Sequence, residues 1–495
     1  MNNEEKSNYS TILKVTKVIG SSTLISMILN MVRMKVAAVF LGPAGVGFIG
    51  LLQSFVLLVS SIIGAGLNQS AIRQVAQVAV SDDEKKKAST QNAVNSLSAI
   101  LVIVGTTLLF YFRDLIEPHI AVSDQYVFGY SWIVLCIALV TLSGIFTAQL
   151  NGYRKIKELA LINVLSAFFS LTLGSLGLYF SDAYGFLIFF VSFFLLRFLF
   201  ASFFLKTIYL NSYDFSNLKS LAIEYQPLLK LGFAMMIGAL AWNFAHLFVK
   251  KLIEEDIGLS EVGVFEAGWT LGTVYLGFLL ASIGADYLPR LTAACEDPKT
   301  FNDIINHQTE VIFLFAGPIV ILTVGLAPWI VVLAYSPEFS RSSDLLRLFI
   351  VGDTLKLLTW PLTYAIIASG YSRYFLFVEL TSVFFYCFVI FLFLDYLGAS
   401  SAGLSIIFIY LAALPLCYFK LRKNFAFKWS TFSIKLFTVI FCTTLLVFLI
   451  GEFSPVYAAL SSVALSIIIA IYSFLSFCKR TGRPHRLQRF TRQKL

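Results

Sequence analysis

The chain has 495 residues, of which 58% are hydrophobic and 13% charged. Soluble globular proteins are about 45–50% apolar and about 25% charged, so this composition excludes an ordinary water-soluble protein. The net charge of +9 does not indicate nucleic acid as a partner, because the basic residues gather in short polar segments between long apolar runs, as in cytoplasmic loops of membrane proteins. Long apolar runs, rather than short alternating strands, predict an all-α integral membrane protein.

Fourteen segments are long and apolar enough to cross a bilayer, which takes about 20 residues. In chain order they lie near 11–40, 44–66, 90–112, 127–149, 159–180, 184–207, 228–250, 262–285, 307–333, 345–368, 374–396, 401–419, 432–450 and 456–478. We predict two six-helix lobes followed by two further helices. The expected domains are an N-lobe at 1–210, a cytoplasmic linker at 211–227, a C-lobe at 228–425, two helices within 426–478 and a basic cytoplasmic tail at 479–495.

The basic residues predict the orientation of these segments. Lys85–Lys87, Arg154–Lys157 and the tail after 478 all fall in alternate gaps, on the same side as the N-terminus. Cytoplasmic loops carry an excess of Lys and Arg, so both termini are expected in the cytoplasm. The polar N-terminus has no small-residue cleavage site after it, and we expect no signal peptide.

The two halves of the chain look duplicated. The first apolar segment leads into Val46-Gly47-Phe48 and the seventh into Val262-Gly263-Val264-Phe265. In each half a second apolar segment and then charged residues follow. Six segments per half in one orientation form a parallel repeat, and transporters built from such repeats place the substrate site between the halves.

No motif indicates catalysis or a cofactor. The chain lacks GxxxxGK[ST], its four histidines have no metal-ligand spacing, and its six cysteines are scattered, as expected of packing residues. We predict that the protein is not an enzyme and has no cofactor or metal. A membrane polymerase or ligase of a polysaccharide pathway is the alternative of another class, although the outer loops near 113–126 and 251–261 are short for it.

Charges inside the apolar segments are the informative signal, because each costs about 2.5–3.5 kcal/mol at a span centre and normally faces a partner or a cavity. In the first segment Asn30 and Arg33 continue a polar stripe that begins at Thr23. Lys35 lies roughly on the opposite side of the helix, so both cations reach one cavity only if the helix bends or unwinds.

The seventh segment places Trp242, His246 and Lys250 on one face, and we expect Lys250 to end it at the outer surface. The tenth places Asp353, Lys356, Trp360 and Tyr364 on one face, where Asp353 and Lys356 can also simply neutralise each other.

Three further charges stand elsewhere in the apolar segments. Glu266 lies in the eighth segment and Glu379 in the eleventh. Arg197 of the sixth segment can alternatively extend toward the inner interface. The fifth segment carries a stripe of small and polar residues that we assign to helix packing, namely Asn163, Ser166, Ser170, Gly174 and Gly177.

A cavity lined by Arg and Lys suits a diphosphate, whose oxygens accept charge-assisted hydrogen bonds. Aromatic and hydroxyl groups beside the cations suit a sugar. The predicted substrate cavity consists of Arg33, Lys35, Asn30, Lys356, Asp353, Trp360, His246 and Arg197. Candidates for coupling transport to protons are Asp353, Glu379 and Glu266.

Two stretches carry a family resemblance. In the first half they are Lys35–Gly47 (KVAAVFLGPAGVG), Gly64–Leu67 and Val75–Gln77; in the second half they are Leu326–Ile330 (LAPWI), Pro337–Phe339, Gly352–Lys356 (GDTLK) and Trp360–Leu362. With them the chain resembles the Wzx-type O-antigen translocases and enterobacterial common antigen flippases of the multidrug/oligosaccharidyl-lipid/polysaccharide exporter superfamily. The resemblance implies two six-helix lobes in a V around a cationic cavity, open alternately to either side, with Lys35 and Lys356 in the cavity.

The resemblance further implies a flippase of the bacterial inner membrane that moves an undecaprenyl-diphosphate-linked oligosaccharide, such as an O-antigen unit. Its partners would be that substrate, membrane lipids and polysaccharide polymerase or assembly proteins, and no nucleic acid. Two extra spans and the basic tail after residue 425 depart from the shorter Wzx-type pattern. Lipid II flippases also carry fourteen spans, so a lipid II-type flippase is one alternative and a MATE-like drug/cation antiporter another.

Overall fold

The computed structural model describes residues 3–79, 83–120, 129–181, 184–208 and 218–481. Throughout these ranges the regular elements are helices, in agreement with the predicted all-α class. Contacts divide the chain into two units, Met1–Gly263 and Val264–Leu495. The predicted tail beyond Thr481 and the first part of the predicted linker, 209–217, lie outside the described residues.

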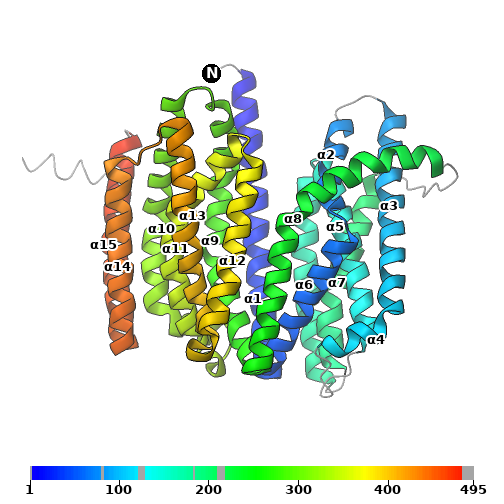
Figure 1. Ribbon diagram of the computed structural model, residues 1–495, viewed down its shortest axis with the longest axis horizontal. Coiled ribbons are helices and arrows are strands. Elements are labelled where there is room, and N and C mark those ends of the chain that lie inside the picture. The colour runs from blue at the N-terminus through cyan, green and yellow to red at the C-terminus, as the bar shows by residue number, and fades with distance from the viewer. Residues whose placement is uncertain (1–2, 80–82, 121–128, 182–183, 209–217, 482–495) are drawn as a thin grey trace, which may run out of the picture. The chain divides into compact units, whose positions relative to one another are not determined.

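The first unit holds eight α-helices and one short 3-10 helix (Figure 1). They are α1 (Asn3–Ile63), α2 (Leu67–Ala79), α3 (Glu84–Tyr111), α4 (Arg113–Ile116), η1 (Glu117–His119), α5 (Tyr130–Gly152), α6 (Ile156–Phe180), α7 (Gly185–Ile208) and α8 (Leu218–Asp256). α5 contacts α1, α2, α3, α6 and α7, so it forms the centre of this unit. α8 starts within the predicted linker and packs against α1, α2 and α3.

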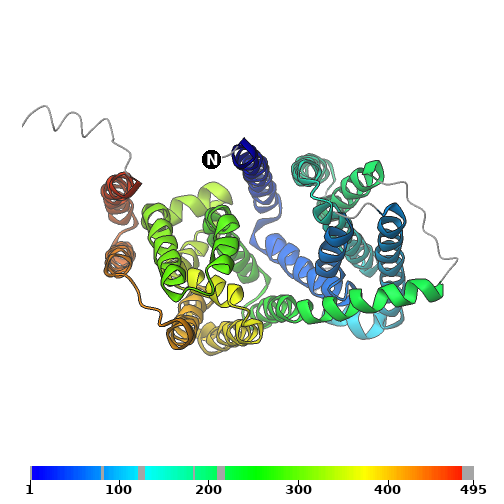
Figure 2. The same cartoon turned by 90° about the horizontal axis from the view of Figure 1, so that it is seen from above.

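The second unit takes its helices from the rest of the chain. They are α9 (Leu259–Ala293), whose first turn still belongs to the first unit, α10 (Pro298–Ala334), η2 (Pro337–Phe339), α11 (Ser342–Ala368), α12 (Ser372–Leu397), α13 (Ser400–Phe425), α14 (Thr431–Phe453) and α15 (Pro455–Thr481). α11 is largely buried and contacts α10, α12, α13 and α14. The two C-terminal helices lie side by side against α10 (Figure 2).

Eleven helices in the described ranges are long and apolar enough to cross a membrane. α1 counts as one of them although it contains the first two predicted segments. α9 and α11 have comparable lengths but fall outside this set. A multi-span membrane protein therefore agrees with the prediction, whereas the number fourteen stays a prediction.

α1 turns at a glycine between those two segments. Gly42 has φ 63° and ψ −170°, and Pro43 follows it. This backbone region is essentially restricted to glycine, and proline removes a helical donor. The break thus falls where the sequence separates 11–40 from 44–66.

The duplicated glycine motifs meet directly after this break. A Cβ atom on Gly47 would lie 2.8 Å from the amide nitrogen of Gly263, and one on Gly263 would collide with the carbonyl of Pro43. Both glycines are needed because main chain touches main chain here. The first turn of α9 is thereby fixed against α1.

We expect Gly42→Ala to destabilise the first unit by about 1–3 kcal/mol, because alanine cannot adopt this backbone conformation without strain. The measurement is the melting temperature of the purified protein in detergent. Gly238→Ala in α8 is the matched control, since an added Cβ there meets no atom within 4 Å. Equal melting temperatures for both variants would contradict the assigned role of Gly42.

Candidate functional site

A buried ion pair lies in the second unit, as its spacing on the tenth predicted segment suggested. The Asp353 side chain is fully buried, and its Oδ1 lies 3.4 Å from the Lys356 ammonium. Tyr275 of α9 donates a 2.7 Å hydrogen bond to Oδ2 of the same carboxylate. The Lys356 side chain keeps 21% of its surface exposed, whereas that of Asp353 is fully buried.

Further polar groups of the second unit surround this pair. Tyr410 of α13 interacts electrostatically with Asp353, Lys356 and Glu379. Glu379 of α12, a predicted coupling residue, thus shares the neighbour Tyr410 with this ion pair. Glu266 stands apart: it interacts with Tyr335 and Tyr386 and precedes Tyr275 by nine residues.

Trp360 belongs to an aromatic group about one turn from Lys356. Its ring stacks on Tyr287 at 5.8 Å and lies 4.2 Å from the ring of Tyr364. The Tyr287 hydroxyl donates to the carbonyl oxygen of Pro361. A Cβ on Gly284 would be 3.0 Å from the Trp360 ring, so the glycine admits the indole. Trp360 packs α9 against α11, and a contact with a sugar stays a prediction.

Arg33 is buried against α7 in the first unit. Its Nη2 donates a 2.6 Å hydrogen bond to the carbonyl oxygen of Phe189. The guanidinium carbon lies 3.9 Å from the ring centre of Phe189 and 4.8 Å from that of Phe193. Gly174 of α6 supports Phe189 from the other side. Arg33 thus joins three helices in this conformation.

Lys35 does not share that environment. The only non-helical conformation within α1 is at Gly42, so the helix stays regular between residues 33 and 35. Two residues correspond to about 200° of rotation, and Lys35 therefore points away from α7. Asn30, one turn before Arg33, is half-buried. A cavity shared by Arg33, Lys35 and Lys356 stays a prediction.

Of two polar residues of α8, His246 lies where its spacing predicts and Lys250 does not. The His246 ring lies 5.9 Å from that of Trp242, as their spacing predicts. Lys250 was expected at the outer surface but is buried, and its ammonium donates to Gly50 O and Ser54 Oγ of α1 at 3.0 and 2.8 Å. The expectation was wrong because α1 supplies oxygens that no local pattern reveals.

Arg197 lines a cavity of about 500 Å³ in the first unit, which carries several polar side chains. The lining comes from five helices and comprises Ser22, Thr23, Asn68, Ile72, Gly144, Thr147, Ala148, Asn151, Ile156, Leu159, Ala160, Asn163 and Arg197. The sequence pattern singled out Arg197, assigned Asn163 to helix packing and gave no indication of Asn68 and Asn151. The small-residue stripe divides: Gly174 and Gly177 pack against α7, as predicted, whereas Asn163 faces this cavity.

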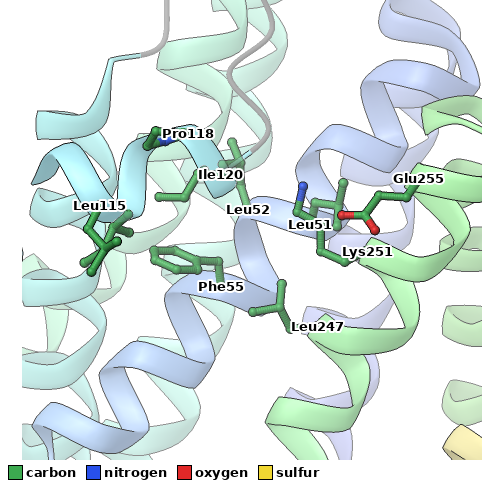
Figure 3. Close-up of a pocket in the computed structure, with 10 residues that line it drawn as sticks. Leu51, Leu52, Phe55, Leu115, Pro118, Ile120, Leu247, Lys251 and Glu255 are labelled. Carbon is green, nitrogen blue, oxygen red and sulfur yellow. The ribbon is translucent and has the colours of Figure 1, made fainter.

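A second cavity of the first unit, about 540 Å³, is mainly apolar (Figure 3). Leu51, Leu52 and Phe55 of α1 face the α4–η1 segment and Leu247 of α8, with Lys251 and Glu255 at one side. The Lys251 ammonium lies 2.6 Å from Glu254, so its charge is already compensated. This cavity suits hydrocarbon better than an anionic head group.

The fold is similar to that of solved membrane proteins. The lipid II flippase MurJ in an inward closed conformation aligns with 94% of this chain and 99% of its own length at 14% identity and a TM-score of 0.71. An inward-facing multidrug resistance MATE family transporter of the MOP superfamily covers 83% of this chain and 98% of its own at 15% identity and a TM-score of 0.67. The predicted superfamily fold is confirmed.

The chain belongs to the polysaccharide biosynthesis protein family, whose model matches residues 12–294. It is similar to two curated proteins named Lipid III flippase, from Escherichia coli (strain K12) and Shigella flexneri. Each is 24% identical over 385 residues, which cover 73% of this chain and 86% of the relative. These relatives carry the names of flippases, in agreement with the prediction that this chain is not an enzyme.

We expect Lys356→Gln to destabilise the protein by about 3–5 kcal/mol, because it leaves the Asp353 carboxylate buried without its cation. The double variant Asp353→Asn/Lys356→Gln removes both charges and should recover most of the loss. Thermal unfolding of the purified variants in detergent measures both effects. Equal stability of the single and double variants would show that the pair is not coupled.

Proposed function

We propose that this protein is a flippase that carries undecaprenyl-diphosphate-linked oligosaccharide, an O-antigen or related repeat unit, from the cytoplasmic to the periplasmic leaflet. The proposal places it in the bacterial inner membrane with both termini in the cytoplasm. Membership of the polysaccharide biosynthesis family supports this class of substrate. The names of the curated relatives support flipping of a lipid-linked substrate.

The observation that carries the proposal is the partly exposed Lys356 beside the buried Asp353. A diphosphate cannot enter hydrocarbon alone, because removing water from its charges costs far more free energy than removing water from a neutral polar group. The Lys356 ammonium has three hydrogen-bond donors. Asp353 also accepts a hydrogen bond from Tyr275, so it does not use all three, and the remaining donors can bind a phosphate. We assign the same role to Lys35 and Arg197.

The mechanism we propose is alternating access. The polar head group crosses along a hydrated path lined by these cations, while the polyprenyl chain stays in lipid. The cations bind the diphosphate in one state and release it when the other state is favoured, which requires different affinities in the two states. Arg33 would join this path only by leaving the Phe189 carbonyl. Asp353, Glu379 and Glu266 remain the candidates for proton coupling.

Two alternatives within the same fold lead to different substrates. A lipid II-type flippase fits as well, because the alignment with MurJ spans 94% of this chain. A drug/cation antiporter would favour acidic groups in an otherwise uncharged cavity, and the intramembrane cations Arg197 and Lys356 argue against it. Polysaccharide polymerase or assembly proteins remain proposed partners.

The site assignment predicts that Lys35→Ala and Asp353→Asn/Lys356→Gln abolish surface polysaccharide in a strain that depends on this protein, while both variants still reach the membrane. Removing the cations removes the contacts to the diphosphate. Lys206→Ala at the exposed end of α7 is the control and should leave polysaccharide unchanged. Normal polysaccharide from both site variants would exclude the assignment.

The substrate proposal predicts which strain the protein rescues. It should restore O-antigen in cells that lack their O-antigen flippase and should fail to restore growth in cells depleted of their lipid II flippase. Immunoblots of surface polysaccharide and growth after depletion are the two measurements. The reverse result would establish the lipid II-type alternative.

A further inference from the structure

The Arg197 cavity of the first unit places a cation among amides. Arg197 lies 12 residues after the start of α7 and 11 before its end, so its Cα is about 16–18 Å from either end at 1.5 Å per residue. The cavity that it lines lies between the last two turns of α5 and the first two turns of α6, so the side chain extends from the middle of α7 toward the end where α5 and α6 meet. The guanidinium thus ends in a cavity near the α5–α6 turn, as the alternative of extension toward an interface also requires.

Within the described residues nothing neutralises this cation. No acidic side chain belongs to the described lining of the cavity, and across the described ranges the structure shows neither an ion pair nor a hydrogen bond for the Arg197 guanidinium. A charged side chain within a membrane protein normally pairs with another group or faces a polar cavity. Arg33, Lys250 and Arg347 by contrast each donate to an oxygen of another helix.

The groups around Arg197 suit a polar anion. Asn68 of α2, Asn151 of α5 and Asn163 of α6 line the cavity, and each carboxamide offers two donors and one acceptor. Asn68 fits beside α5 because residue 144 is glycine: a Cβ there would lie 2.9 Å from the Asn68 amide nitrogen. Arginine binds phosphate and carboxylate with two parallel hydrogen bonds, and amides pair with hydroxyl groups.

We propose that this cavity is a binding site for an oxyanion that carries hydroxyl or amide groups, such as a sugar phosphate, with Arg197 on the anion and Asn68 and Asn163 on the neighbouring polar groups. Its volume of about 500 Å³ lies in the range of small-molecule sites, about 300–1,000 Å³. The identity of the ligand rests on the proposed function, in which the anion is the sugar diphosphate of the substrate. A phospholipid head group offers the same anion.

The test measures binding to the purified full-length protein in nanodiscs of neutral lipid. The probes are farnesyl-diphosphate-linked N-acetylglucosamine and, in a second arm, phosphatidylglycerol added to the nanodisc. Arg197→Gln should weaken binding of the sugar-linked probe by about tenfold or more, since charged hydrogen bonds are the strong ones. Arg197→Lys should lose part of the affinity, and Asn163→Ala less than Arg197→Gln.

Lys206→Gln is the matched control, because it removes a cation from the exposed end of the same helix. If Arg197→Gln does not fold, Asn163→Ala and Asn68→Ala carry the test. If Arg197→Gln binds the probe as well as the unchanged protein, or if Lys206→Gln loses as much affinity as Arg197→Gln, the proposed site is wrong. The cavity is then a hydrated crevice that binds no anion. Competition by phosphatidylglycerol that depends on Arg197 supports the oxyanion site but assigns a phospholipid as the bearer. If Arg197→Gln loses binding of the probe but cells that carry it make normal surface polysaccharide, the cavity binds an anion but does not belong to the proposed transport path.

Discussion

A charge within an apolar helix must be satisfied by another part of the chain, and this requirement determines where many of the helices touch. Arg33 joins α1 to α7 through the Phe189 carbonyl, and Lys250 joins α8 to α1. In the second unit Arg347 of α11 donates to the carbonyl of Phe448 and pairs with Glu452 at 3.0 Å, which holds α14. Each contact gives a buried cation an oxygen acceptor on another helix in place of water.

Glycines make these polar contacts geometrically possible. Gly174 lets α6 approach Phe189 closely, so that the ring and carbonyl are fixed for Arg33. Gly272 similarly admits Phe349, which brings α9 close enough to α11 for Tyr275 to reach Asp353. In membranes, helices associate through van der Waals packing and interhelical hydrogen bonds, and small residues let the backbones approach closely enough for both. The buried charges therefore depend on the packing around them.

Arg33, Lys250 and Arg347 support the fold through bonds to other helices, whereas Lys356 and Arg197 are the cations that we assign to a substrate. Lys356 shares its charge with Asp353 yet keeps part of its surface exposed. Arg197 faces a cavity lined by amides. A transported diphosphate needs cations that it can approach and leave. We therefore assign function to the cations that the fold does not fully satisfy.

The sequence alone determined the helical class, the break in α1 between residues 40 and 44, the Asp353–Lys356 pair and the packing stripe of α6, because helical periodicity and glycine chemistry are local properties. It could not determine that Arg33 and Lys250 are satisfied by other helices, nor that Asn68, Asn151 and Asn163 gather around Arg197. Those partners lie tens to hundreds of residues away, and only the packing of the helices decides which faces meet.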